Sequence, residues 1–151
     1  MKFLIQEVTK ASVSVDNTVV GAIDRGMLIF VGITDDDNTE TADKMIKKCS
    51  GLRIFMDSNG KTNLSLKDID GSMLIVSQFT LYADCRKGNR PSFTKAGSPE
   101  HANILYEYII DKFKNECGYT VQTGIFGADM KVSLINDGPF TIMLDSNELF
   151  S

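Results

Sequence analysis

The sequence predicts a single mixed α/β domain in which two β-sheets form a barrel-like core and helices pack on one side, giving three layers, α/β/β. The chain has 151 residues, which is the size of one domain with a full hydrophobic core. Several strand patterns, two helix-and-strand pairs and further strand patterns follow one another along it. No repeat, linker or low-complexity run divides the sequence, so we expect one domain over residues 1–151.

The first third of the chain has strand patterns followed by a helix pattern. Alternating apolar residues on both sides of Asp16-Asn17 predict a hairpin. The continuous apolar run Met27–Val31 predicts a central strand that is covered on both faces. A short amphipathic helix that ends at Gly51 should follow. Its apolar positions, at helical spacing, are Ala42, Met45, Ile46 and Cys49.

The rest of the chain alternates strands with one long helix. Leu52–Met56 and Ser72–Phe79 have strand patterns, and a turn separates them. Ser98-Pro99-Glu100 predicts a helix start, because a hydroxyl, a proline and an acid are all favourable there. Gly118 is placed to end this helix in the left-handed conformation. The last strands are predicted at 120–124, 131–135 and 140–144.

Composition excludes several classes of protein. The three cysteines include no C-x-x-C pair, so we expect neither a disulfide framework nor a metal knuckle, and a cytosolic protein is the simplest reading. The apolar runs are far shorter than the ~20 residues that a membrane helix needs, so no membrane contact is expected. No nucleotide fingerprint is present, and we expect no cofactor and no metal. The net charge of −4 means that nucleic-acid binding would need a local basic patch.

Few side chains suggest chemistry. The single histidine, His101, falls in the first turn of the long helix, where the positive helix end disfavours the imidazolium that a general base must become. We therefore expect a surface or capping role for it. The acidic run Asp35–Asp37 lacks the glycine and the distal glutamate of a calcium loop and is predicted to be a solvated turn.

Packing alone does not explain three stretches of the chain. Ser77–Asp84 places polar residues at the end of a strongly apolar strand, where site residues often lie. The stretch 86–95 holds a glycine, four basic residues and no acid, and it is either a phosphate-binding patch or a solvated loop. Asn136–Thr141 contains the turn dipeptides Asp-Gly and Gly-Pro; it is either a plain turn or a loop with a cis proline.

Together these stretches closely resemble the D-aminoacyl-tRNA deacylase family. The segments that carry the resemblance are Gln6–Val13, Ser77–Thr80, Lys87–Phe93, Thr123–Met130 and Asn136–Pro139. The resemblance implies a cytoplasmic homodimer that hydrolyses the ester between a D-amino acid and the terminal adenosine of tRNA. It also implies removal of glycine mischarged on tRNA, with aminoacyl-tRNA as the partner and no DNA or membrane.

The resemblance also implies roles for individual residues. The catalytic segment would be Ser77, Gln78, Phe79 and Thr80, with Thr80 at the position often assigned as nucleophile. Gly138 and Pro139 would form a Gly-cisPro chiral filter that reaches into the partner's active site. The pocket for the terminal adenosine would be lined by Ala102, Phe126 and Met130. From the basic loop, the expected phosphate contacts are Arg86, Lys87, Arg90 and Lys95.

The sequence leaves two catalytic mechanisms open. Thr80 could attack covalently, or it could orient a water molecule, and no sequence-adjacent base is visible to activate it. An aminoacyl ester is already activated and a ribose hydroxyl can assist, so we favour water attack, with the N–H groups of Phe79 and Thr80 stabilising the oxyanion. Glu7 and Ile125 depart from the family, which commonly has a basic residue and an arginine there. Glu7 puts in doubt any ionic link from the N-terminal strand to the Gly-Pro loop. Ile125 is expected to weaken the contact with RNA.

Two rival functions stay open. The chain could be a catalytically silent RNA-binding or dimerisation module on the same scaffold. It could also be a small-molecule esterase that uses Thr80 or Ser77.

Overall fold

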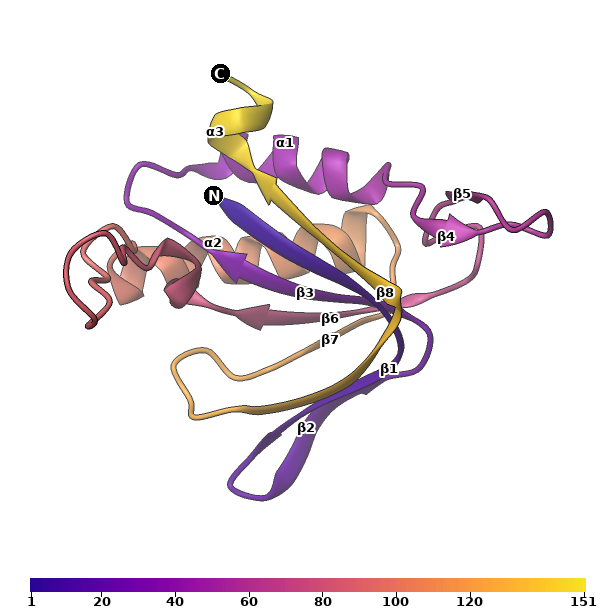
Figure 1. Ribbon diagram of the computed structural model, residues 1–151, viewed down its shortest axis with the longest axis horizontal. Helices are drawn as coiled ribbons and strands as arrows, with labels where there is room; N and C mark the ends of the chain where they lie inside the picture. The colour runs from indigo at the N-terminus through magenta and orange to yellow at the C-terminus, as the bar shows by residue number, and fades with distance from the viewer.

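The computed structural model describes all residues 1–151, and Figure 1 shows the chain folded around one strongly bent sheet with helices on one side. The strands are β1 (Lys2–Val15), β2 (Thr18–Ile23), β3 (Gly26–Gly32), β4 (Phe55–Met56), β5 (Thr62–Leu64), β6 (Ser72–Ser77), β7 (Val121–Thr123) and β8 (Lys131–Asp145). The α-helices are α1 (Thr39–Ser50), α2 (Pro99–Asp111) and α3 (Ser146–Leu149). A 3₁₀ turn, η1 (Phe79–Tyr82), follows β6, and a π turn, η2 (Lys112–Glu116), follows α2.

Long strands make the sheet bend into a barrel. The order is β2-β1-β3-β6-β7, and β8 runs antiparallel along the other side of β1. The first half of β1 pairs with β3 and its second half pairs with β2, so the sheet turns along this strand. A Cβ at Gly21 would lie 2.5 Å from the carbonyl oxygen of Thr123, so β2 comes close to β7 and nearly closes the barrel. The predicted fold class is confirmed, and the two predicted sheets are continuous through β1 and β8.

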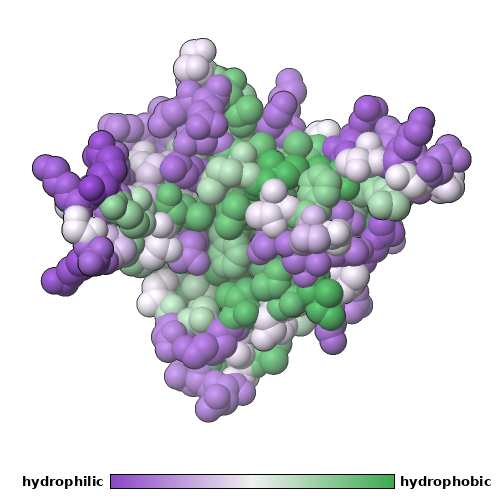
Figure 2. Space-filling view, in the orientation of Figure 1, coloured by the Kyte–Doolittle hydropathy of each residue, from purple (hydrophilic) through white to green (hydrophobic).

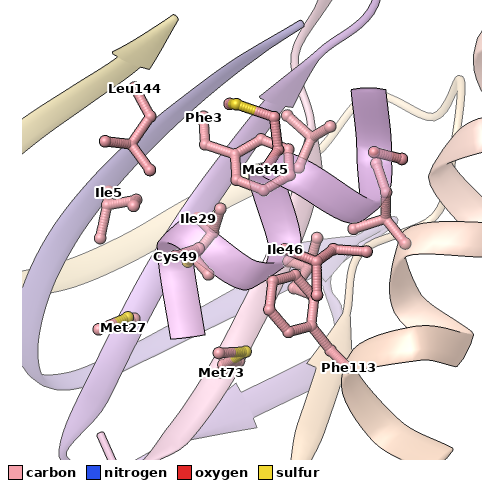
Figure 3. Close-up of a cluster of buried hydrophobic side chains, with 14 of the residues drawn as sticks. Phe3, Ile5, Met27, Ile29, Met45, Ile46, Cys49, Met73, Phe113 and Leu144 are labelled. Atoms are coloured by element: carbon pink, nitrogen blue, oxygen red, sulfur yellow. The ribbon is translucent and has the colours of Figure 1, made fainter. Parts of the chain in front are cut away.

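The bent sheet has a core on each face. A cluster of 23 buried residues lies between the sheet and helices α1 and α2, and a cluster of 7 fills the inside of the barrel. Along β3, Met27 and Ile29 belong to the helix side while Leu28 belongs to the barrel side, which is why this strand is apolar at every position. Figure 3 shows Met45 and Cys49 of α1 lying over the strand residues of the helix-side core.

Helix ends follow the sequence signals only in part. The side chain of Asn38 accepts the Thr41 N–H at 3.0 Å and caps α1. Helix α2 begins where predicted, but Ser98 does not cap it. The N–H and the hydroxyl of Ser98 instead donate to Oδ1 of Asp35, at 2.8 and 3.1 Å. Gly118 has φ 73°, the predicted left-handed conformation.

None of the helices has the length and hydropathy that crossing a bilayer requires.

Several strand boundaries differ from the sequence expectation. Residues from Lys2 onward already belong to β1, because they pair with β3 and β8 as well as forming the predicted hairpin further along. The predicted strand Leu52–Met56 is reduced to β4, which makes a separate two-stranded ribbon with β5. The strand predicted over Ser72–Phe79 stops at Ser77, where the chain turns into η1.

The stretch predicted to link two strands near residue 138 lies inside one strand, β8. Gln6 of β1 pairs with Thr141, and Val8 pairs with Asn136. Four residues lie between the two paired positions on β8 and one residue lies between them on β1, so residues 137–140 bulge out of the ladder. We call this segment the β8 bulge.

Candidate active site

A pocket of about 530 Å³ opens where the parallel strands β3 and β6 end. The ends of parallel strands are the usual place for a ligand site in an α/β sheet. The pocket brings together predicted site residues from distant parts of the chain, namely Ser77, Gln78, Phe79, Ala102, Phe126 and Met130. Thr80 is exposed and lies outside the lining, one residue beyond Phe79.

Aromatic rings support the pocket from below and flank its mouth. Phe126 lies against Tyr106, with ring centroids 5.7 Å apart, and the Tyr106 hydroxyl donates to the carbonyl oxygen of Ile75 at 2.8 Å. Phe79 and Phe93 meet edge to face, with centroids 5.2 Å apart, and both are exposed. An apolar pocket with exposed rings at its mouth suits a flat, ring-bearing ligand.

The segment after β6 offers hydrogen-bond donors and no base. Nε2 of Gln78 donates to Oγ1 of Thr80 at 2.5 Å, so the hydroxyl is oriented by an amide. The first backbone donor within η1 is Leu81, which bonds the carbonyl of Gln78 at 3.3 Å. The N–H groups of Phe79 and Thr80 therefore have no partner within the turn, and they can stabilise a developing oxyanion. An amide cannot take a proton from Thr80, so the hydroxyl is positioned without being activated.

The other titratable candidates are engaged elsewhere. A ring nitrogen of His101, Nε2, lies 2.9 Å from the carbonyl oxygen of Asp37, and His101 does not line the pocket. This contact fits the structural role predicted for the only histidine. Cys49 is fully buried in the helix-side core, and burial raises the pKa of its thiol to about 12. A thiol in that position is neutral and inert.

The basic loop is less uniform than its sequence indicated. The guanidinium of Arg86 binds both carboxylate oxygens of Asp84, with Nε 2.9 Å from Oδ1. These bonds hold the pKa of the Asp84 carboxyl well below its usual range. The other three predicted contacts, Lys87, Arg90 and Lys95, are exposed and form no ion pair within the chain. These three side chains are available to bind phosphate, whereas the carboxylate of Asp84 neutralises the charge of Arg86.

The β8 bulge carries the predicted filter residues. The Gly138-Pro139 peptide bond is cis, and both residues are exposed. The side chain of Asn136 braces the bulge, because its Oδ1 accepts the N–H of Phe140 at 3.0 Å and its Nδ2 donates to Oγ1 of Thr141 at 2.9 Å.

The bulge and the pocket do not meet within the chain. Val8 pairs with Asn136 beside the bulge and with Gly26 at the start of β3, whereas the pocket lies at Val31, near the end of β3. A rise of about 3.3 Å per residue separates these two ends of β3 by roughly 17 Å. Neither Gly138 nor Pro139 lines the pocket. The two parts of the site that the sequence suggested thus lie apart in a single chain.

Glu7 sits directly opposite the bulge. It is only 7% exposed, and burial raises the pKa of its carboxyl, with a further increase from Asp137 and a partial offset from Arg25. Glu7 therefore places an acid against an acidic bulge residue, Asp137, and it provides no ionic link to the bulge. Ile125 is exposed and does not line the pocket.

Comparison with known proteins gives a consistent likeness over the whole chain. A family model described as D-Tyr-tRNA(Tyr) deacylase matches residues 4–145. A protein of Thermotoga petrophila named D-aminoacyl-tRNA deacylase is 53% identical over 150 residues, which cover 99% of this chain and 100% of that protein. A protein of Flavobacterium psychrophilum with the same name is 55% identical over 146 residues, covering 97% of each chain.

Solved structures share the fold. One named "c-Myc DNA Unwinding Element Binding Protein" has a TM-score of 0.90 and 38% identity, and the match covers 96% of this chain and 98% of that one. Another, described as "a probable eukaryotic D-amino acid tRNA deacylase", has a TM-score of 0.77 and 18% identity, covering 95% of this chain and 97% of that one. The second likeness is one of fold alone.

Proposed function

The chain belongs to the D-Tyr-tRNA(Tyr) deacylase family, and from this premise we propose that it protects translation by hydrolysing D-aminoacyl-tRNA and sparing L-aminoacyl-tRNA. It is a D-aminoacyl-tRNA deacylase, an ester hydrolase, and the resemblance read from the sequence is confirmed. We place its action in the cytoplasm, because translation consumes aminoacyl-tRNA there. The observation that carries the proposal is the pocket that joins the Ser77–Phe79 segment to an apolar wall.

The apolar wall would hold the terminal adenosine. Ala102, Phe126 and Met130 line one cavity together with Phe79, and Tyr106 keeps Phe126 in place. A nucleobase seated among these side chains buries its flat faces against apolar atoms, as base-binding sites do. Its ribose would then bring the ester to the segment after β6.

Hydrolysis in this pocket needs little from side chains. Water attacks the ester carbonyl carbon, and the neighbouring ribose hydroxyl orients it and relays its proton. The N–H groups of Phe79 and Thr80 stabilise the oxyanion that forms. The bond between the carbonyl carbon and the ribose oxygen then breaks, that oxygen takes the proton, and free amino acid and tRNA leave. Gln78 holds the Thr80 hydroxyl just outside the pocket, so the hydroxyl is not needed as a nucleophile.

Chirality would be read by main-chain atoms of a second protomer. Because the β8 bulge lies roughly 17 Å from the pocket of its own chain, we propose that it covers the pocket of the partner in a homodimer. The carbonyls of Gly138 and Pro139 would accept hydrogen bonds from the substrate's ammonium group. A D side chain would then point to solvent, and an L side chain would collide with the bulge. Glycine has no side chain to exclude, so glycine mischarged on tRNA would also be removed.

The surface along β8 supports a dimer. This strand is at the edge of the sheet, and Ile135 and Met143 on it are 50% and 44% exposed. Figure 2 shows hydrophobic surface across the middle of this face of the molecule, where β8 passes in Figure 1. An uncovered edge strand with exposed apolar side chains is commonly covered by a partner.

The basic loop would contact the tRNA backbone. Lys87, Arg90 and Lys95 are exposed, free of ion pairs and close in sequence to Phe93 at the mouth of the pocket. On a chain of net charge −4 they form a local basic patch, and phosphate attraction there would be lost at high salt.

The deciding experiment compares deacylation of D-aminoacyl-tRNA, L-aminoacyl-tRNA and a simple activated ester. Fast loss of the D ester alone is expected. A silent RNA-binding module would leave all three intact, and a small-molecule esterase would prefer the simple ester.

The Ala102→Phe variant, checked for native folding by circular dichroism, should be inactive because the new ring fills the pocket. Binding to duplex DNA at the same salt should be weak, since the chain is acidic overall.

A further inference from the structure

A second cavity, of about 550 Å³, lies beside the pocket and shares a wall with it. Phe93 and Gly97 line the pocket, Thr94 and Lys95 line the second cavity, and Ala96 lines both. One strip of backbone therefore separates the two spaces. A strand whose last nucleoside fills the pocket would reach the second cavity with the nucleoside before it.

Distant parts of the chain build this second cavity. Its other lining residues are Thr34, Asp35, Asp36, Asp37, Thr41, Lys44, Tyr82, Ser146, Asn147 and Phe150. Figure 1 shows helix α3, next to the C-terminus, beside the start of α1, which brings the C-terminal end of the chain to this cavity. The lining is mostly polar, in contrast to the apolar pocket.

Two of the three carboxylates in this cavity are used within the protein. Oδ1 of Asp37 accepts from the α-ammonium of Met1, and its Oδ2 accepts from the N–H of Thr34, each at 2.8 Å. Oδ1 of Asp35 accepts from the N–H and the hydroxyl of Ser98. No group of three or more His, Cys, Asp and Glu side chains is arranged to hold a metal ion. The engaged carboxylates shape the cavity and leave other groups to meet a ligand.

Several polar groups of the lining have no partner. The hydroxyl of Tyr82, a residue only 8% exposed, makes no hydrogen bond, which is costly for a buried donor. Asp36 and Lys95 make no ion pair, and the side chain of Asn147 makes no hydrogen bond. The ring of Phe150 is 40% exposed. The cavity thus offers a free carboxylate, two free donors on Lys95 and Asn147, and an aromatic face.

We propose that this cavity binds the penultimate nucleoside of the substrate, the cytidine that precedes the terminal adenosine in tRNA; the proposal rests on the deacylase function. Cytosine presents an amino donor beside ring nitrogen and carbonyl acceptors. Asp36 accepts from the amino group, Asn147 and Lys95 donate to the acceptors, and the base stacks on Phe150. A bare phosphate fits less well, because three aspartates face two lysines in this cavity.

The proposal is tested with three small substrates that carry the same D-amino acid. These are the 3′ esters of adenosine, of cytidylyl-adenosine and of uridylyl-adenosine. The cytidylyl ester should show a kcat/KM about tenfold or more above the other two, since uracil has a carbonyl where cytosine has its amino group. In whole tRNA, replacing the penultimate cytidine by uridine should slow deacylation by a similar factor.

Variants assign the preference to the cavity. Asp36→Asn should reduce the preference for the cytidylyl over the uridylyl ester, and Asn147→Ala should reduce the gain over the adenosine ester. Asp24→Asn, which removes the same charge from an exposed turn outside both cavities, should change neither ratio. Equal rates on all three esters would overturn the cytidine site and leave the deacylase function standing. Failure to hydrolyse any D-aminoacyl ester or D-aminoacyl-tRNA would overturn both.

Discussion

Tyr106 connects the helical layer to the strand that leads into the active site, and the Tyr106→Phe variant tests that connection. The side chain is 1% exposed, its hydroxyl donates to the carbonyl of Ile75 in β6 at 2.8 Å, and its ring supports Phe126. The substitution removes one oxygen atom and leaves the ring. It therefore separates the contribution of the hydrogen bond from that of packing.

The size of the effect follows from what is left behind. The carbonyl of Ile75 also accepts the N–H of Gly124, at 3.2 Å, so it stays paired when the Tyr106 hydroxyl is gone. We therefore expect the net value of an ordinary hydrogen bond, about 1 kcal/mol, and not the larger cost of an orphaned buried group. In a domain of this size, about 1 kcal/mol lowers Tm by about 2–4 °C. Because the ring still supports Phe126, kcat/KM for D-aminoacyl-tRNA should change less than about twofold.

The assay combines urea unfolding, thermal unfolding and single-turnover deacylation. Tyr106→Leu is the matched control, since it removes the ring as well; it should cost roughly 2–4 kcal/mol and weaken deacylation by loosening Phe126. A loss of more than about 3 kcal/mol in the Tyr106→Phe variant, or loss of its activity with native stability, would refute this reasoning. Either result would mean that the hydroxyl does more than join helix α2 to β6.

Three further predictions concern charge and chemistry at the site. Glu7→Gln should stabilise the protein at neutral pH, because burial and Asp137 raise the pKa of the Glu7 carboxyl and its charged form therefore costs stability above that pKa. Urea unfolding should show that the free-energy advantage of the variant disappears as the pH falls from that raised pKa to the pKa of the unfolded chain. Replacing Lys87 and Arg90 by alanine should weaken tRNA binding and reduce the salt slope of log K by about two, and an unchanged slope would assign both side chains to solvent. Thr80→Ala keeps the backbone N–H, so single-turnover deacylation should persist, whereas a 2′-deoxy substrate should react far more slowly. A folded but inactive Thr80→Ala protein would contradict water attack assisted by the RNA.

Hydrophobic pattern predicted the fold class because each element buries a face that its own sequence marks. Met27–Val31 is apolar at every position since it separates two cores, and the helix before Gly51 has one apolar stripe since it covers one. The β8 bulge could not be predicted in the same way. It arises from pairing with β1, far away in sequence, and Asp-Gly-Pro reads equally well as a turn between two strands.

The sequence predicted only those parts of the site that lie in recognisable local motifs. The resemblance named six of the 17 residues that line the pocket, because those six stand in or near recognisable segments. The second cavity was missed, since Tyr82, Asn147 and Phe150 are unremarkable in sequence and meet only when the C-terminus packs near the N-terminal strand. The pairing of Arg86 with Asp84 was missed because the acid lies just outside the basic run.

The central claim, that the pocket of one protomer works with the β8 bulge of its partner, is tested most directly with mixed dimers. Gly138→Ala should spoil the filter, since φ is +123° and a Cβ would lie 3.2 Å from the Phe140 nitrogen; Ala102→Phe should block the pocket. The Gly138→Ala homodimer should hydrolyse L- as well as D-aminoacyl-tRNA, and the Ala102→Phe homodimer neither. In the mixed dimer the open pocket faces an intact bulge, so the account predicts hydrolysis of the D ester and rejection of the L ester. Hydrolysis of the L ester at the rate per open pocket of the Gly138→Ala homodimer would contradict it.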